Sequence, residues 1–138
     1  MLTGHCLCGA IRFEVTPPLQ GVGNCHCSMC RRSHGTPFFT YAQVEREGLR
    51  VLAGAEHVRR FRSSPPVERS FCDTCGANFT FAFDGMPGSI WVAAGLFDDD
   101  PALRPDHHIF VASKASWHEI TDALPQHAEY PPMPGAAN

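Results

Sequence analysis

The residues of this chain that can do chemistry are above all its seven cysteines, which fall into three tight clusters. The clusters are Cys6 and Cys8, then Cys25, Cys27 and Cys30, and finally Cys72 and Cys75. The two pairs together supply the four thiolates of a closed tetrahedral zinc site, whereas a triplet can hold a metal and leave one position open. The spacing therefore predicts one site that stabilises the fold and one site that can bind a further ligand.

A disulfide framework is the first alternative interpretation of these thiols. An odd number of cysteines leaves at least one thiol without a partner. The N-terminal residues contain no basic stretch followed by an apolar run, so we expect no secretory signal and a cytoplasmic location. Thiols persist and bind metal in such a reducing compartment. A disulfide within C-x-C or C-x-x-C would also close only a small ring and restrain little of the unfolded chain.

An iron–sulfur cluster is the second alternative, because it also needs four thiolates. Ferredoxin-type spacing gathers three or four cysteines in one run, and the longest run here has three with no fourth nearby. The C-x-x-C-G turn from Cys72 to Gly76 is typical of zinc knuckles. Zinc is therefore the favoured metal, while rubredoxin-type iron at the four-thiolate site stays open.

The fourth ligand of the triplet is not fixed by the sequence. It could be water, a substrate thiol or a side chain, and the candidate nitrogens are those of His26, His34, His107 and His108. A histidine would make the triplet a second structural site. Three thiolates on Zn²⁺ form a negatively charged complex, which activates water poorly but can hold an incoming thiol deprotonated. An open triplet thus points to thiol chemistry rather than hydrolysis.

The size and composition of the chain exclude several classes of protein. Its 138 residues correspond to one domain, and 43% hydrophobic residues suffice for a core. No apolar run approaches the roughly 18 residues that span a membrane, so no membrane partner is expected. The net charge of −3 argues against nucleic acid as a partner and makes a nucleic-acid-binding zinc ribbon the weakest hypothesis. The basic run 59–62 is typical of a solvated strand face, although it could also attract an anion.

About eight short stretches, some alternating apolar and polar residues and others rich in aromatic residues, have the character of strands with turn residues between them, which indicates an all-β domain, a barrel or packed sheets. They span residues 10–15, 38–42, 49–52, 58–61, 67–71, 78–83, 89–94 and 108–111. Helical signal is scarce: one turn over 28–33 with Gly35 as its stop, and a short helix over 117–124 before Pro125. We expect one zinc-binding domain over residues 1–125 and a mobile, proline-rich tail over 126–138.

Three motifs carry a resemblance to a known family. They are Gly4-His-Cys6-Leu-Cys8-Gly9, Cys25-His-Cys27-Ser-Met-Cys30-Arg31-Arg32 and Phe71-Cys72-Asp-Thr-Cys75-Gly76. With a later stretch from Pro105 to Trp117, they resemble the glutathione-dependent formaldehyde-activating enzyme family, which includes centromere protein V. The resemblance covers most of the chain, and all seven cysteines fall on the pattern.

The resemblance implies a zinc-stapled β-tent fold of short antiparallel strands with little helix. It implies a structural zinc on Cys6, Cys8, Cys72 and Cys75, and a second, labile zinc at a catalytic site formed by Cys25, Cys27 and Cys30. The implied activity is that of a carbon–sulfur lyase that joins formaldehyde to glutathione.

We therefore expect a zinc-dependent lyase for a small thiol and an aldehyde, in which Arg31, Arg32 or His34 could bind an anionic end of the thiol. The alternative is a non-enzymatic zinc-binding scaffold or interaction module. A homodimer stays open, as does the identity of both substrates.

Overall fold

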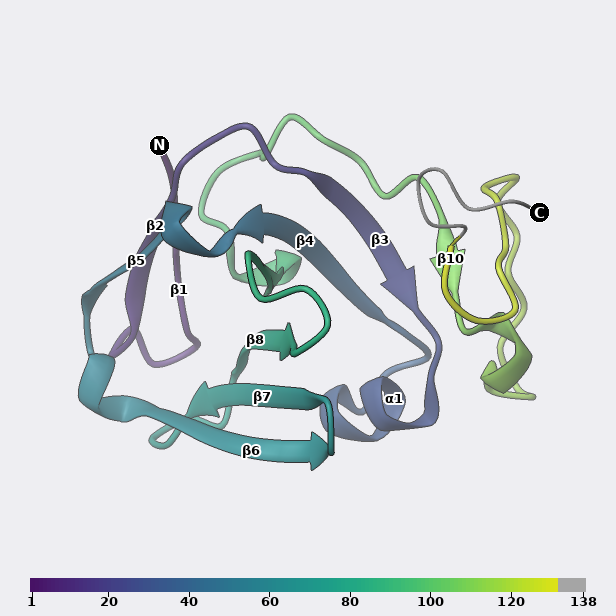
Figure 1. Cartoon of the computed structure of the whole chain (residues 1–138), viewed down its shortest axis with the longest axis horizontal. Coiled ribbons are helices and arrows are strands. Elements are labelled where there is room, and N and C mark those ends of the chain that lie inside the picture. Colours follow the sequence, from purple (N-terminus) through teal and green to yellow (C-terminus); the bar gives the residue numbers. More distant parts are fainter. Residues whose placement is uncertain (132–138) are drawn as a thin grey trace.

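The computed structural model describes residues 1–131 and is mainly β, with ten strands and one α-helix in that range (Figure 1). The strands are β1 (Leu2–His5), β2 (Arg12–Val15), β3 (Gly21–Cys25), β4 (Phe39–Glu45), β5 (Leu49–Ala53), β6 (Val58–Ser64), β7 (Val67–Cys72), β8 (Asn78–Phe83), β9 (Ser89–Ala93) and β10 (His108–Ile109). The α-helix is α1 (Ser28–His34), and the single-turn 3-10 helices are η1 (Arg46–Gly48), η2 (Ala55–His57), η3 (Ala94–Leu96) and η4 (Val111–Ser113). The expected fold class is confirmed.

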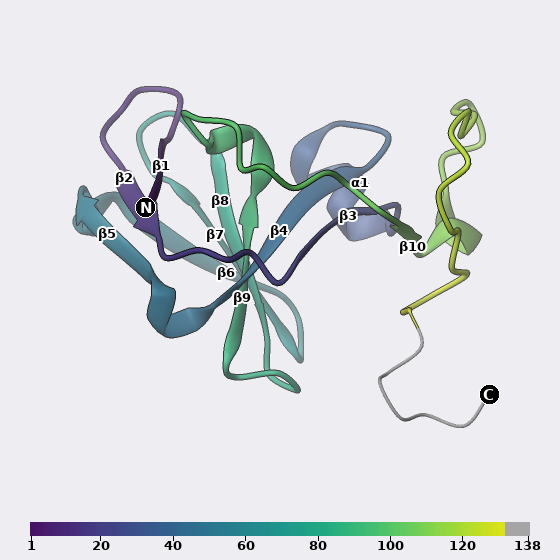
Figure 2. The same cartoon turned by 90° about the horizontal axis from the view of Figure 1, so that it is seen from above.

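The strands form two sheets. The smaller has the order β1-β2-β5, and the larger has the order β10-β3-β4-β9-β8-β7-β6. Neighbouring strands are antiparallel except for β10, which pairs parallel to β3. The small sheet lies at one end of the molecule, and β10 with the chain that follows it lies at the other (Figure 2).

The central strands of the seven-stranded sheet carry apolar side chains on both faces. Along β9, Val92 belongs to one apolar core, whereas Trp91 and Ala93 belong to another. Successive residues of a strand point to opposite faces, so the two cores lie on opposite sides of this sheet. The buried members of the first core are Cys6, Ile11, Phe13, Val15, Val44, Cys72, Phe79 and Val92. Those of the second are Cys25, Cys30, Phe39, Tyr41, Trp91, Ala93 and Ile109.

The first core is anchored on β2, where Phe13 is fully buried. Its ring centroid lies 5.0 Å from that of Phe79 and 5.9 Å from that of Phe97. Contacts between aromatic rings at such distances add to the free energy gained by burying their surface. The small sheet is thereby packed onto one face of the large one.

Helix α1 begins and ends where the sequence predicts. The Cys27 sulfur accepts a hydrogen bond from the Cys30 backbone N–H and so caps the first turn. Gly35 ends the helix with a φ of 65°, a left-handed conformation that glycine adopts without strain. Arg31, Arg32 and His34 lie in the last turn, where positive charge stabilises the helix dipole.

Three sequence expectations need correction or completion. Strands β1 and β3 were not predicted, because the glycines in both interrupt the alternation that marks a strand. The helix expected over 117–124 is wrong: these residues form a turn and irregular chain. The Asp122 carboxylate accepts a hydrogen bond from the Leu124 backbone N–H, a local bond that competes with helix formation.

The segment after Pro125 continues the ordered chain for several residues. The backbone N–H of His127 donates to the His108 carbonyl over 2.9 Å, and the N–H of Phe110 donates to Glu129 over 2.9 Å. The predicted mobile tail therefore includes residues that hydrogen-bond to β10 and η4, while its residues 132–138 lie outside the described range. Within residues 1–131 no helix has both the length and the apolar character to cross a membrane.

The glycine that follows β5 provides a test of this packing. Gly54 has a φ of 80°, and a Cβ at this position would collide with the Ala10 carbonyl oxygen. We expect Gly54→Ala to lower the free energy of unfolding by about 2–4 kcal/mol, from backbone strain and overpacking together. Gly21→Ala is the matched control, because nothing lies within 4 Å of its Cβ position. Urea unfolding of both variants checks this, and equal stability would contradict the structure.

Candidate metal centres

Four sulfur atoms from two distant turns meet at one place. Cys6 and Cys8 lie in the turn between β1 and β2, whereas Cys72 ends β7 and Cys75 lies in the turn before β8. All four Sγ atoms lie within 4.8 Å of one another. The Cys8 Sγ is 3.6 Å from that of Cys6 and 3.8 Å from that of Cys72. The sequence prediction that the two pairs would meet is matched by this geometry.

Each of the two turns depends on a glycine. Gly9 and Gly76 have φ values of 79° and 78°. Their backbone N–H groups donate to the carbonyls of Cys6 over 3.0 Å and Cys72 over 2.9 Å, which closes both turns. The Cys6 sulfur accepts its hydrogen bond from the Ile11 N–H over 3.3 Å. The turns thus direct both thiols of a pair to the same side.

The other three sulfurs gather where β3 passes into α1. Cys25 ends β3, Cys27 caps α1, and Cys30 lies in its first turn, with all three Sγ atoms within 4.8 Å of one another. Cys25 and Cys30 are buried, whereas Cys27 is half-buried. The Cys30 N–H donates to the Cys27 sulfur over 3.2 Å, so the helix cap itself orients this thiol.

Each of the two thiol clusters fits one metal ion. A tetrahedral zinc with Zn–S distances of about 2.3 Å separates its sulfur ligands by about 3.8 Å, close to the spacings of the quartet. All seven cysteines are free thiols, which disfavours the disulfide alternative for this fold. Soft sulfur donors select zinc or iron over harder cations. The two clusters can therefore each hold a metal ion, one with four sulfur ligands and one with three.

The thiols of the triplet share negative charge unequally. Hydrogen bonds from the Cys25 and Cys30 thiols lower the pKa of Cys27 to about 2, with help from the Cys30 N–H and the charge of Arg69. Hydrogen bonds with Cys27 and Cys30, together with burial, raise the pKa of Cys25. The most exposed sulfur of the triplet is therefore the one that carries a thiolate most readily.

None of the four histidines proposed as a fourth ligand joins the triplet sulfurs within residues 1–131. The His34 ring stacks on Phe39 with centroids 4.1 Å apart. His107 Nε2 lies 2.8 Å from the Tyr41 hydroxyl. His26 and His108 bond to each other. Each of these imidazoles is engaged elsewhere, so the described chain leaves the triplet with three protein ligands.

A chain of hydrogen bonds that begins at the buried His26 and ends at the exposed Asp122 holds the backbone between Cys25 and Cys27. His26 Nε2 and His108 Nδ1 are 2.8 Å apart, and His108 Nε2 lies 3.0 Å from the Asp122 carboxylate. When His108 donates Nε2–H to Asp122, its Nδ1 accepts the proton of His26 Nε2–H. Burial lowers the pKa of His26 to about 4, so this ring is neutral at pH 7. The His26 side chain is thereby fixed by protein contacts alone.

Arg69 is the residue at the triplet that sequence reasoning missed. It lies on β7, is only 7% exposed, and its Nη2 donates to the Cys30 sulfur over 3.5 Å. Its position between Val67 and Phe71 on one face of the strand was the available signal, because a single arginine among inward-facing apolar residues is rarely solvated. The basic run 59–62, in contrast, is exposed as expected.

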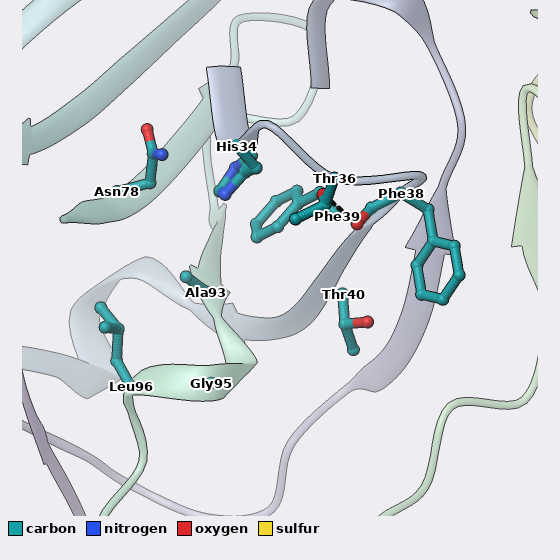
Figure 3. A pocket seen from close by; sticks show the side chains of 9 residues that line it. All are labelled: His34, Thr36, Phe38, Phe39, Thr40, Asn78, Ala93, Gly95 and Leu96. Atoms are coloured by element: carbon teal, nitrogen blue, oxygen red, sulfur yellow. Dashed lines mark hydrogen bonds between the residues drawn. The ribbon is translucent and has the colours of Figure 1, made fainter. Parts of the chain in front are cut away.

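A cavity of about 350 Å³ opens beside the end of α1 (Figure 3). Its lining residues are His34, Thr36, Phe38, Phe39, Thr40, Asn78, Ala93, Gly95 and Leu96. Figure 3 shows His34 and Phe39 side by side on one wall, with Ala93 and Leu96 across from them. His34 and Phe39 also line a narrower space that reaches Arg69 and Phe81. This narrower space has no room for a water molecule, so His34 and Phe39 form the wall between the cavity and the surroundings of Arg69.

The chain matches a protein-family model and is similar to several known proteins. A family model described as glutathione-dependent formaldehyde-activating enzyme matches residues 1–113. The "Putative glutathione-dependent formaldehyde-activating enzyme" of Halomonas elongata is 32% identical over 128 residues, which cover 87% of this chain and 81% of that protein. An uncharacterized lyase of Schizosaccharomyces pombe is 25% identical over 119 residues, 86% of this chain and 85% of that protein. The crystal structure of a Rhodobacter sphaeroides protein matches with a TM-score of 0.61 at 28% identity, covering 71% of this chain and 89% of that one.

Protonation of His34 is expected to make the fold sensitive to acid. Burial and the nearby charge of Arg69 lower the pKa of His34 to about 4, whereas an unfolded histidine titrates near 6.5. As the pH falls from about 6.5 to about 4, the unfolded chain takes up a proton that the folded chain refuses, so stability is lost over this window. We expect His34→Phe, which keeps the ring on Phe39, to reduce the loss of stability between pH 7 and pH 5 in urea unfolding.

Comparing wild type with His34→Phe controls for titration of the thiols, since both proteins carry the same seven cysteines. An acid-dependent loss of the same size in both proteins would show that His34 is not the group responsible.

Proposed function

Because the chain belongs to the glutathione-dependent formaldehyde-activating enzyme family, we propose that it is a zinc-dependent carbon–sulfur lyase acting on a small thiol and an aldehyde such as formaldehyde. The observation that carries the proposal is the difference between the two sulfur clusters. One offers four ligands and the other three, with no histidine joining the three in the described chain. A metal with three protein ligands has room for the sulfur of a substrate.

We assign the structural zinc to Cys6, Cys8, Cys72 and Cys75, and the second zinc to Cys25, Cys27 and Cys30. When bound at the triplet, zinc lowers the pKa of an incoming thiol and holds it as a nucleophilic thiolate at neutral pH. The protein contributes the placement of the sulfurs. Cys27 is the half-buried member of the triplet, so an incoming thiol approaches on its side.

The proposed reaction involves no change of oxidation state. In the direction of synthesis the thiol sulfur attacks the carbonyl carbon, a C–S bond forms, and the carbonyl oxygen takes up the proton that the thiol lost. In the direction of the lyase the hydroxyl proton leaves, the C–S bond breaks, and thiol and aldehyde separate. Aromatic residues on the second core, including Phe81 and Trp91 with ring centroids 4.8 Å apart, keep water from one side of the triplet.

The last turn of α1 is our candidate for binding an anionic end of the thiol. Arg31 and Arg32 supply the positive charge there. The pKa of His34 is about 4, so this ring is neutral at pH 7 and can act only as a hydrogen-bond partner. Arg31 Nε is buried without a hydrogen-bond partner in the described chain, and an unmet donor of this kind favours a ligand that accepts.

The function is tested with ¹³C-formaldehyde and a panel of thiols that includes glutathione, cysteine and 2-mercaptoethanol. Formaldehyde and thiols also combine without a catalyst, so the exchange rate between free formaldehyde and the hydroxymethyl adduct is measured by ¹³C exchange NMR. We expect the zinc-loaded protein to accelerate exchange for at least one thiol. If no thiol is accelerated and both metal ions are bound equally tightly, the chain is a zinc-binding scaffold.

Loss of one triplet thiol should separate metal binding from folding. We expect Cys27→Ser to lose the second zinc, leaving about one ion per chain, and to abolish the acceleration of exchange. The fold should persist, because both apolar cores remain intact. Metal content by mass spectrometry under non-denaturing conditions and far-UV circular dichroism check this expectation. Retention of both ions would count against the assignment.

Loss of a quartet thiol should have a different effect. We expect Cys75→Ser to be insoluble or unfolded, because the quartet joins the start of the chain to the β7–β8 turn and its metal binding contributes directly to folding. The yield of soluble protein and its thermal unfolding are the measurements. Equal damage from Cys27→Ser and Cys75→Ser would mean that the two clusters do not have separate roles.

A further inference from the structure

Arg69 is a buried cation without a carboxylate partner. In residues 1–131 no Asp or Glu oxygen lies within 4.0 Å of its guanidinium. The arginines on the adjacent strand β6 differ: Arg59, Arg60 and Arg62 are exposed, and each is paired with an acidic side chain. Burying a guanidinium costs several kcal/mol unless an opposite charge compensates it. The compensating charge has to come from another group near Arg69.

The contacts of Arg69 point to the sulfur triplet. Its Nε donates to the Ser63 hydroxyl over 3.0 Å, and its Nη2 donates to the Cys30 sulfur over 3.5 Å. The guanidinium carbon also lies 5.8 Å from the centroid of the Phe81 ring. Ser63 and Phe81 are uncharged, so among the described residues the one anionic partner in reach is the thiolate cluster. The bond from Nε to Ser63 orients the guanidinium while its Nη2 reaches the Cys30 sulfur.

The charge balance of the metal-loaded triplet indicates what the contact between Arg69 and Cys30 does. Three thiolates around a divalent metal ion carry a net charge of −1, which the single positive charge of Arg69 neutralises. A thiolate arriving as fourth ligand then leaves the buried group at −1 rather than −2. Charges in a protein interior are poorly screened, so this difference is large at a buried site.

We propose that Arg69 is the counter-cation of the sulfur triplet and that its charge allows this site to take an anionic sulfur from outside the protein as fourth ligand. The inference rests on the proposed function for the identity of that ligand. The quartet needs no such cation: its Cys6 sulfur accepts from the Ile11 backbone N–H, and Cys8 is open to solvent, which screens its charge. Arg69 is thus a positioning residue: it acts through Cys30, and its positive charge offsets the negative charge of the thiolates at the reaction site.

Metal affinity is the first test, on the full-length chain loaded with zinc. The weaker of two zinc affinities is measured by competition with a chromophoric chelator for wild type, Arg69→Met, Arg69→Lys and Arg60→Met. Arg60 is the matched control, since it is exposed on the neighbouring strand and paired with Glu68. We expect Arg69→Met to weaken the triplet site about 10- to 100-fold, the size typical of losing a partner of a metal ligand. Arg69→Lys and Arg60→Met should stay within about threefold, and the tighter site should not change.

Ligand binding is the second test, and it separates charge from shape. Cobalt replaces zinc, and 2-mercaptoethanol and imidazole are titrated while the absorption bands of cobalt are followed. We expect Arg69→Met to weaken the anionic thiolate at least about tenfold and to leave the neutral imidazole unchanged or tighter. Equal weakening of both ligands would reduce Arg69 to a packing role, and no weakening of the thiolate would overturn the proposal.

Arg69→Lys keeps the test decisive if Arg69→Met does not fold. A charge role predicts near-normal thiolate binding for lysine, whereas a role for the planar fork predicts a loss as large as that for methionine. Both readouts are independent of turnover. Arg69-dependent thiolate binding without accelerated exchange would refute the proposed lyase and keep this inference, and accelerated exchange unaffected by Arg69→Met would do the opposite.

Discussion

The alternation of side chains along β4 and β9 is the constraint on which the rest of the structure depends. Both strands lie inside the seven-stranded sheet, and their residues divide between two apolar cores. Val44 and Val92 pack toward the small sheet, whereas Tyr41 and Trp91 pack toward the sulfur triplet. A one-residue shift in register would exchange the two sets. One sheet therefore keeps two thiol clusters apart, each in an apolar environment of its own.

The two environments explain why similar ligands can serve different purposes. The quartet sits at the ends of two turns, where Cys6 and Cys72 are buried but Cys8 is exposed, so water reaches one side of the cluster and screens part of its charge. The triplet lies in an aromatic core, where an uncompensated charge is costly and where Arg69 is buried with it. Because the charge of the triplet is largely buried and is compensated by one arginine, adding one further charge changes its free energy strongly. Chemistry that creates or removes a thiolate is thus better placed at the triplet than at the quartet.

The features that could be predicted from the sequence are those set by residues close together in the chain. The cysteine clusters and the cap of α1 are local, and both are visible in short windows of residues. The regular alternation expected over 78–83 is broken, because Phe79 packs in the first core and Phe81 against the second, next to a register shift in the pairing with β7. Strand β3 escaped because Gly21 and Gly23 obscure its pattern, although Gly23 is needed where His107 approaches the strand closely. The pairing of His26 with His108 and the bond from Arg69 to Cys30 join residues far apart in the chain. Such contacts between distant residues leave no recognisable pattern in any one segment of the sequence.

The backbone that carries the triplet is held by contacts on the side away from the sulfurs, and these contacts affect how the site can bind its ligands. Strand β10 pairs with the end of β3, and the His26–His108–Asp122 chain ties the residue between Cys25 and Cys27 to the C-terminal segment. These contacts involve no sulfur, so the three thiols are held together before any metal arrives. A preorganised site binds its ion with little loss of conformational entropy and can exchange a fourth ligand without local unfolding. The quartet unites two turns that lie far apart in the chain, so an ion bound there would be coupled to the fold, whereas an ion bound by the triplet would be free to exchange its fourth ligand.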